Sequence, residues 1–174
     1  MVGEIRDAET ARIATQAALT GHRVLSTVHT NDAAGAITRL IDMGIEPFLV
    51  ASVLLVSFAQ RLVRKVCPHC AVRCAPSRQS RAFWGVPDHE EFVAMKAKGC
   101  ARCQHTGYQG RIGIFEVLMM DDMIRELIAR KATTAEINQA ARAACRLRTL
   151  KEDALDKLRQ GITTIEEAMS VVNI

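Results

Sequence analysis

Four of the six cysteines stand in two closely spaced pairs, Cys67-Pro68-His69-Cys70 and Cys100-Ala101-Arg102-Cys103. Two intervening residues let both sulfur atoms of a pair face the same point from one tight turn. Four thiolates brought together in this way form a closed tetrahedral site, which suits Zn²⁺. The alternatives are two disulfides or four inert thiols. Because no signal peptide is visible, we expect one structural zinc held by Cys67, Cys70, Cys100 and Cys103.

Other side chains near the pairs are weaker candidates for metal ligands. Cys74 fits neither pair, and Cys145 lies on a predicted helix, so we expect both to be packing residues. His69 and His105 are close enough to the pairs to replace a thiolate, and they rank below the four cysteines. Little apolar sequence is available between the pairs, and Phe83 and Trp84 are expected to fill its small core.

A carboxylate and an imidazole form a second candidate site near the N-terminus. Residues 1–5 read as the end of a buried strand, and residues 23–28, rich in Val, Leu and Thr, predict another. Between them, Asp7 is a good N-cap for a helix that runs to about Leu19 and stops at Gly21. This order predicts a β–α–β unit with parallel strands and a right-handed crossover.

The predicted unit brings Glu4 and His29 to the same edge of a sheet, where ligands of open α/β sheets bind. Glu4 could orient or deprotonate a water molecule there, and His29 could sense or stabilise a phosphate. The alternatives are a solvated loop acid for Glu4 and a satisfied strand-end histidine for His29.

Local signals predict the remaining elements. Asp32 can cap a helix over 33–43, and Pro47 opens a second helix whose apolar run, 48–59, is followed by cations suited to a helix C-terminus. Residues 111–118 predict a strand. Helices should then start near Asp121 or Asp122 and at three Thr-x-x-Glu capping boxes. These boxes are Thr133–Glu136, Thr149–Glu152 and Thr163–Glu166.

Composition sets outer limits on the function. The chain has 174 residues, 49% hydrophobic and 24% charged, which is typical of a globular protein. Its net charge of +4 is mild and does not demand a nucleic-acid partner. The longest apolar run, near 48–59, is well short of the roughly 20 residues that span a bilayer.

Several stretches together resemble the secretion ATPases of type II secretion and type IV pilus assembly. Residues 3–11, Gly-Glu-Ile-Arg-Asp-Ala-Glu-Thr-Ala, resemble the end of that family's Walker B motif, and 19–22 and 26–31 resemble its His box. Residues 39–48, 60–62 and 110–116 match the family pattern, as does a four-cysteine insert in this place. The resemblance covers essentially the whole chain, and type II secretion is slightly the closer match.

The resemblance implies an α/β fold: the second half of a RecA-like P-loop ATPase domain with a tetracysteine zinc module and a helical C-terminal tail. We expect a partial ATPase core at 1–65, the zinc module at 66–110, and a returning strand with helices at 111–174. The family role assigns Glu4 and His29 to catalysis and places Arg6 and Thr30 near the nucleotide. It also implies a cytoplasmic homo-hexamer, peripheral to the inner membrane, that acts on inner-membrane platform proteins.

The phosphate-binding part of such an enzyme is not found in the sequence. No G-x-x-x-x-G-K-[ST] stretch occurs. We therefore expect the chain to be the C-terminal half of a longer ATPase, with Met1 an internal methionine, a misassigned start or a cloning boundary. ATP and Mg²⁺ are expected only in the complete protein. The chain alone should not hydrolyse ATP, and uncovered strand edges should favour self-association.

Two other function classes are open. A zinc module that binds nucleic acid would use the basic residues flanking the first cysteine pair, but aromatic residues for stacking are few. Those basic residues are Arg61, Arg64, Lys65, Arg73, Arg78 and Arg81. A non-catalytic protein-interaction module is a related alternative. A zinc enzyme is disfavoured, because four cysteine ligands leave no open position on the metal.

Overall fold

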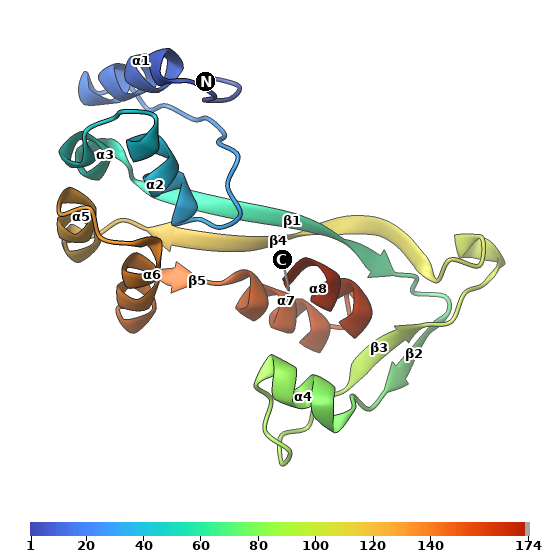
Figure 1. The fold of residues 1–174 in the computed structure, drawn as a ribbon. Helices are drawn as coiled ribbons and strands as arrows, with labels where there is room; N and C mark the ends of the chain where they lie inside the picture. Colours follow the sequence, from blue (N-terminus) through green and yellow to red (C-terminus); the bar gives the residue numbers. More distant parts are fainter. Residues whose placement is uncertain (173–174) are drawn as a thin grey trace. The chain divides into compact units, whose positions relative to one another are not determined.

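The computed structural model describes residues 1–172, which fall into two compact units. Unit 1 comprises Met1–Ala59 and Glu116–Arg148, and unit 2 comprises Gln60–Phe115 and the described residues from Thr149 onward. Each unit contains both helices and strands (Figure 1). This mixed architecture confirms the predicted α/β class. Unit 2 joins the predicted cysteine-containing segment to the last two helices of the chain.

Unit 1 is built mainly from helices packed around one hydrophobic core. Its large buried side chains include Ile37, Val50, Leu118, Ile124 and Ile128. The helices are α1 (Ala8–Leu19), α2 (Gly35–Asp42), α3 (Pro47–Val53), α5 (Asp122–Ala129) and α6 (Thr134–Ala143).

The first helix forms as predicted, but the strands expected on either side of it do not. Asp7 caps α1 by accepting from Thr10 N at 2.8 Å, and Gly21 follows its end with φ of +89°. The segments at 1–5 and 23–28 lie side by side through Val2 N to Leu25 O and Ile5 N to Thr27 O. They run in the same direction, as predicted. Two backbone bonds do not make a regular ladder, however, so neither segment is a strand.

The second predicted helix ends earlier than expected. α3 stops at Val53, and Val56–Val66 is a strand, β1, rather than the continuation of a helix. Within β1 the buried residues are Ser57, Ala59, Val63 and Val66, and the first two alternate with exposed neighbours as in a half-buried strand. The prediction that the following cations lie at a helix C-terminus was therefore wrong.

Three strands form one sheet in the order β1-β4-β5. β4 (Tyr108–Met119) extends the predicted strand at both ends, and β5 (Leu147–Arg148) pairs antiparallel with it, Leu118 opposite Leu147. β1 and β4 each begin in one unit and end in the other. β4 supplies Leu118 to the core of unit 1 and Ile114 to that of unit 2, and β1 supplies Val63 to the core of unit 2.

Unit 2 has its own core, centred on Val63, Trp84, Ile114, Ala154 and Leu158. Trp84 is 3% exposed and meets Phe83 edge to face at 5.0 Å, which confirms the predicted aromatic core. The elements specific to this unit are β2 (Ala71–Cys74), α4 (Arg78–Trp84), β3 (Ala94–Ala97), the 3-10 turn η1 (Ala101–Cys103), α7 (Leu150–Arg159) and α8 (Ile165–Val172).

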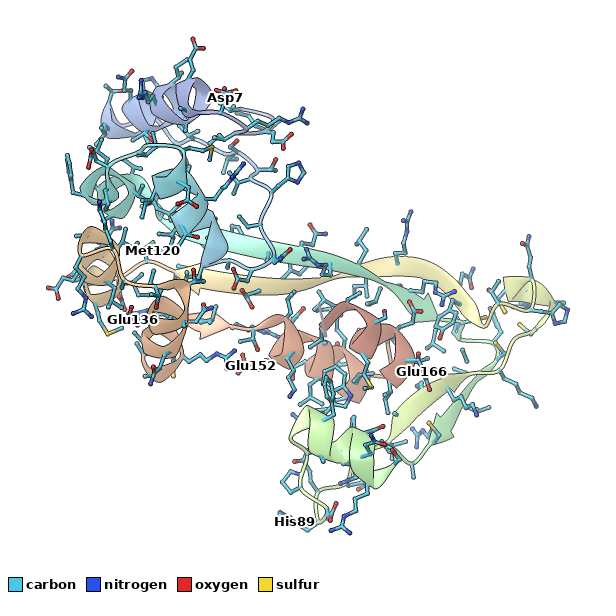
Figure 2. The ribbon with its side chains drawn as sticks, in the orientation of Figure 1. Asp7, His89, Met120, Glu136, Glu152 and Glu166 are labelled. Carbon is cyan, nitrogen blue, oxygen red and sulfur yellow. The ribbon has the colours of Figure 1, made fainter. Side chains whose placement is uncertain are left out.

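Two of the three predicted capping boxes are present. Thr133 with Glu136 begins α6, and Thr149 with Glu152 begins α7; the two glutamates are labelled at these helix starts in Figure 2. The third prediction was wrong by one residue. Thr164 Oγ1 accepts from Glu167 N at 3.4 Å, whereas Thr163 Oγ1 donates to Arg64 O. The repeated Thr-Thr and Glu-Glu pairs make both registers possible, and the bond to Arg64 selects this one.

Candidate functional site

The four paired cysteines meet at one point of unit 2. Their sulfur atoms all lie within 4.8 Å of one another, and Cys103 Sγ is 3.8 Å from both Cys70 Sγ and Cys100 Sγ. All four are free thiols. In a tetrahedral site with Zn–S bonds of about 2.3 Å, neighbouring sulfur atoms are about 3.8 Å apart. The arrangement therefore fits a zinc ion, and the disulfide alternative is not realised.

Two tight turns hold these sulfur atoms in place. Cys70 N and Ala71 N both donate to Cys67 O in the first turn, and Cys103 N and His105 N both donate to Cys100 O in the second. Gly107 closes the second turn with φ of +79°, and a Cβ there would lie 2.6 Å from that of Ala97. A side chain at this position would push the second cysteine pair away from β3.

The thiols differ in their electrostatic surroundings. Burial raises the pKa of the Cys103 thiol, but the N–H groups of Cys100 and Gly107, each 3.2 Å from its sulfur, together with the neighbouring thiols outweigh that effect and bring the pKa to about 6. Burial raises the pKa of Cys70 to about 11. The cluster therefore provides one sulfur that readily carries a negative charge, as a metal ligand must.

The secondary candidates lie outside the cluster. His69 and His105 are exposed, and the ring of His69 instead contacts the Arg102 guanidinium at 3.0 Å. Cys74 Sγ lies 3.6 Å from Ala94 O on the neighbouring strand. Cys145 is exposed with φ of +54° just after α6, so its predicted role as a helical packing residue was wrong.

The second candidate site brings together Glu4 and His29 from the two segments that flank α1. His29 Nε2 lies 2.5 Å from Glu4 Oε1, and Arg6 Nε lies 2.5 Å from Glu4 Oε2. The Glu4 side chain is 18% exposed, whereas that of His29 is 86% exposed. A partly buried carboxylate thus sits between two side chains that can carry positive charge, beside open solvent. Such a carboxylate can accept hydrogen bonds from a water molecule or hold a cation.

Thr30 and Asp32 shape the loop that follows His29. Thr30 Oγ1 donates to Asp32 O at 3.0 Å, and Asp32 Oδ1 accepts from Gly35 N at 2.7 Å at the start of α2. This bond reaches the first residue of α2, but the N-cap is Ala34 and makes no side-chain capping bond, so the predicted cap at Asp32 and the predicted helix start at residue 33 were wrong. Thr30 is partly buried, and its hydroxyl is used within the loop rather than directed to the pair formed by Glu4 and His29.

Sequence reasoning missed two buried polar residues that contact this loop, Ser57 on β1 and Glu116 on β4. Ser57 is 7% exposed and Glu116 is 8% exposed. Glu116 shares one face of β4 with Ile114 and Leu118, which are both fully buried. A carboxylate at an apolar position of a period-two pattern is a signal that the sequence does contain.

Several of the basic residues near the first cysteine pair are engaged by acceptors of the chain itself. Arg64 pairs with Glu167 at 2.5 Å and lies 4.1 Å from the centre of the Tyr108 ring. Arg81 donates to Pro87 O at 2.7 Å, and Arg78 lies 3.7 Å from Asp88. These contacts reduce the positive surface that a nucleic-acid partner would require.

Comparisons with known proteins point to one family. The model of the family described as "Type II/IV secretion system protein" matches residues 1–170. The chain is 50% identical over 171 residues to the type II secretion system ATPase E of Vibrio cholerae. It is 51% identical over 172 residues to the type IV pilus assembly ATPase PilB of Thermus thermophilus. Each alignment covers 98% of this chain, but only 34% and 19% of the relatives' own lengths.

Solved structures agree on the fold. The pilus retraction motor PilT, crystallised with bound ADP, matches 98% of this chain and 39% of its own with a TM-score of 0.64. The ATPase DotB of Legionella pneumophila matches 99% of this chain and 38% of its own with a TM-score of 0.63. Both are 24% identical to this chain, so they show the fold alone.

Among residues 1–172, no helix combines the length and the apolar character that crossing a bilayer requires.

Proposed function

Because the chain belongs to the type II/IV secretion system protein family, we propose that it is the C-terminal part of a hexameric ATPase that powers protein secretion or type IV pilus assembly. The observation that carries this proposal is the 2.5 Å contact between Glu4 and His29 across the two segments flanking α1. The relatives named as ATPases align with 98% of the chain, and the pilus motor with bound ADP shares its fold.

In this proposal Glu4 orients or deprotonates the water that attacks the terminal phosphate. Its partly buried carboxylate is held by Arg6, so it has a fixed direction before any nucleotide arrives. His29 is exposed and within reach of Glu4, so it can contact a phosphate and respond to its loss. Arg6 and Thr30 are assigned to the surroundings of the nucleotide, with ATP and Mg²⁺ held by the complete protein.

The tetracysteine cluster takes a structural zinc in this proposal. Cys67, Cys70, Cys100 and Cys103 offer four sulfur atoms at the spacing of a tetrahedral site and leave no position for a substrate. The metal would fix the two turns of unit 2, where the core is small. It would take no part in phosphate chemistry.

The setting proposed for the complete protein rests on the family resemblance of the sequence. It would act as a homo-hexamer in the cytoplasm, peripheral to the inner membrane, and move inner-membrane platform proteins of a secretion or pilus machine. No nucleic-acid partner is proposed.

The test compares phosphate release and nucleotide affinity in the complete ATPase. Glu4→Gln keeps the size of the side chain and should bind ATP normally while turnover falls by at least about a hundredfold, the scale of lost general-base catalysis. His29→Ala should lower turnover with a smaller effect on binding. Glu166→Gln, which neutralises an exposed acid in the first turn of α8, is the matched control. Unchanged turnover in Glu4→Gln would remove Glu4 from the site.

A further inference from the structure

The backbone of Ala33 is held at both of its polar groups by buried side chains. Glu116 Oε1 accepts from Ala33 N at 2.8 Å, and Ser57 Oγ donates to Ala33 O at 2.8 Å. Ser57 lies on β1 and Glu116 on β4, which are neighbours in the sheet. Ala33 itself is fully buried. Side chains of two adjacent strands therefore hydrogen-bond to one residue of the loop between His29 and α2.

A carboxylate at position 116 is costly for the core. Its neighbours on the same face of β4 are apolar, and burying a carboxyl group destabilises a fold unless hydrogen bonds compensate. An aliphatic residue would continue the alternation of Ile114 and Leu118 at no such cost. The hydrogen bond that Glu116 accepts fixes the position of the Ala33 amide.

The held residue is close to His29 along the chain. Only three residues separate His29 from Ala33. They form a short loop, residues 30–32, that is fixed by the hydrogen bonds from Thr30 to Asp32 and from Gly35 to Asp32. A Cβ on Gly35 would lie 2.7 Å from Asp32 Oδ1, so this loop is closely packed on itself. Displacement of Ala33 would therefore carry His29 with it.

His29 has little packing of its own to hold it. Its side chain is 86% exposed, and its ring contacts the carboxylate of Glu4. The position of its ring accordingly depends on the backbone anchors that follow it in the chain.

We propose that Glu116 is a positioning residue for His29. Glu116 binds the backbone N–H of Ala33, and Ser57 binds the carbonyl of the same residue. The loop at residues 30–32 connects this fixed backbone to His29 and so sets the position of its imidazole beside Glu4. This inference rests on the proposed function, because it assigns the purpose of the anchor to the catalytic site.

The first test reads position directly in the 174-residue protein. NMR of the His29 ring, assigned by the loss of its signal in His29→Ala, should show a shifted and broadened resonance in Glu116→Leu. The Ala33 amide should also exchange faster with solvent in that variant. Glu116→Gln retains a carbonyl acceptor and should restore both signals. A folded Glu116→Leu protein with the wild-type His29 signal would overturn the proposal.

A second pair of variants keeps the test decisive if Glu116→Leu does not fold. Ser57→Ala and Thr15→Val each remove one buried hydroxyl that donates to a backbone carbonyl at 2.8 Å in unit 1. Only Ser57→Ala removes a contact with Ala33. We expect only Ser57→Ala to shift the His29 signal, and equal effects from both variants would overturn the proposal.

Kinetics separate this proposal from the proposed function. In the complete ATPase, Glu116→Leu should lower kcat about tenfold with KM for ATP nearly unchanged, because a small displacement of a catalytic group reduces the rate more than binding. Glu116→Gln should recover most of the lost rate. If His29→Ala leaves turnover unchanged while Glu116→Leu still moves the His29 signal, the catalytic role of His29 fails and the positioning role stands.

Discussion

At the scale of single residues, the chemistry and spacing of side chains predicted the tetracysteine cluster correctly. The two C-x-x-C pairs lie 30 residues apart or more, yet their sulfur atoms meet within 4.8 Å. The spacing of the cysteines predicts such a site because each chelating turn is a local structure. Binding to a shared metal ion then brings the two turns together. Glu116 was missed for the opposite reason. Its significance depends on Ala33, which is 83 positions away in the sequence and has no polar side chain to signal the contact.

Replacement of one cysteine tests the metal assignment. Purified protein should contain about one zinc per chain, as a closed four-thiolate site requires. Cys100→Ser should lose most of that zinc, because a neutral hydroxyl is a poor substitute for a thiolate. Elemental analysis provides the measurement.

Cys74→Ser is the matched control for that experiment. Cys74 lies on β2 in the same unit, and its sulfur contacts Ala94 O rather than the cluster. Its replacement should leave zinc occupancy unchanged. Full retention of zinc in Cys100→Ser would count against the four-cysteine assignment.

At the scale of helices and strands, predictions held where a local signal was unambiguous. Asp7, Thr133 and Thr149 each cap the helix that the sequence assigns to them, because a capping bond involves only the next three residues. The prediction of one helix through the apolar run at 48–59 was wrong. Periodicity alone does not separate a buried helix from a strand whose hydrogen-bond partner lies far away in the sequence. The strand β4 that completes β1 begins some 50 residues later.

The turn at Gly107 should tolerate no side chain. Gly107→Ala must keep a positive φ and also bring its Cβ to 2.6 Å from Ala97, so we expect destabilisation of about 1–3 kcal/mol, the usual range for overpacking. Gly85→Ala has φ of +70° but nothing within 4 Å, and it should cost less. Denaturant titration of both variants measures the difference. Equal losses would show that contact with Ala97 is unimportant.

The ion pair between Arg64 and Glu167 should make unit 2 sensitive to acid. The side-chain hydrogen bond from Arg64 lowers the pKa of Glu167 below its ordinary value of 4.5. A lowered carboxyl pKa in the folded state adds stability that is fully present above pH 4.5 and is lost as the pH falls through the lowered pKa. Glu167→Gln should therefore lower Tm at pH 7 and have progressively less effect below pH 4.5.

Arg64→Met provides the reciprocal check, because it removes the donor and keeps the aliphatic stem. Its effect on Tm should shrink over the same pH range. A Glu167→Gln deficit that stays constant as the pH falls would exclude the carboxylate charge as its cause.

At the scale of the molecule, each unit has a core of its own, and only unit 2 contains the tetracysteine cluster. The sequence predicted the α/β class and the family. It did not predict that α7 and α8 share a core with the cysteine-containing segment, since Ala154 and Leu158 lie more than 60 residues from Trp84 in the chain. Packing between distant apolar residues leaves no local signature.

Removal of the metal should loosen unit 2 and leave unit 1 intact. Binding of structural zinc contributes on the order of 10 kcal/mol in small zinc-binding peptides, which is comparable to the whole stability of a domain. After treatment with a chelator, amide hydrogen exchange should accelerate around both cysteine turns, β2 and β3, whereas α1 and α2 keep their protection. Uniform acceleration across the chain would show that the two units unfold together.

The central claim is that this chain supplies Glu4 and His29 to an ATPase whose nucleotide is held by another part of the complete protein. Phosphoryl transfer requires the triphosphate and Mg²⁺ to be positioned before any base can act. The most direct test is steady-state phosphate release by the 174-residue chain alone and by the complete protein, each with and without Glu4→Gln. We predict no measurable hydrolysis by the chain alone and robust hydrolysis by the complete protein that Glu4→Gln abolishes. Robust hydrolysis by the 174-residue chain, abolished by Glu4→Gln, would contradict the account.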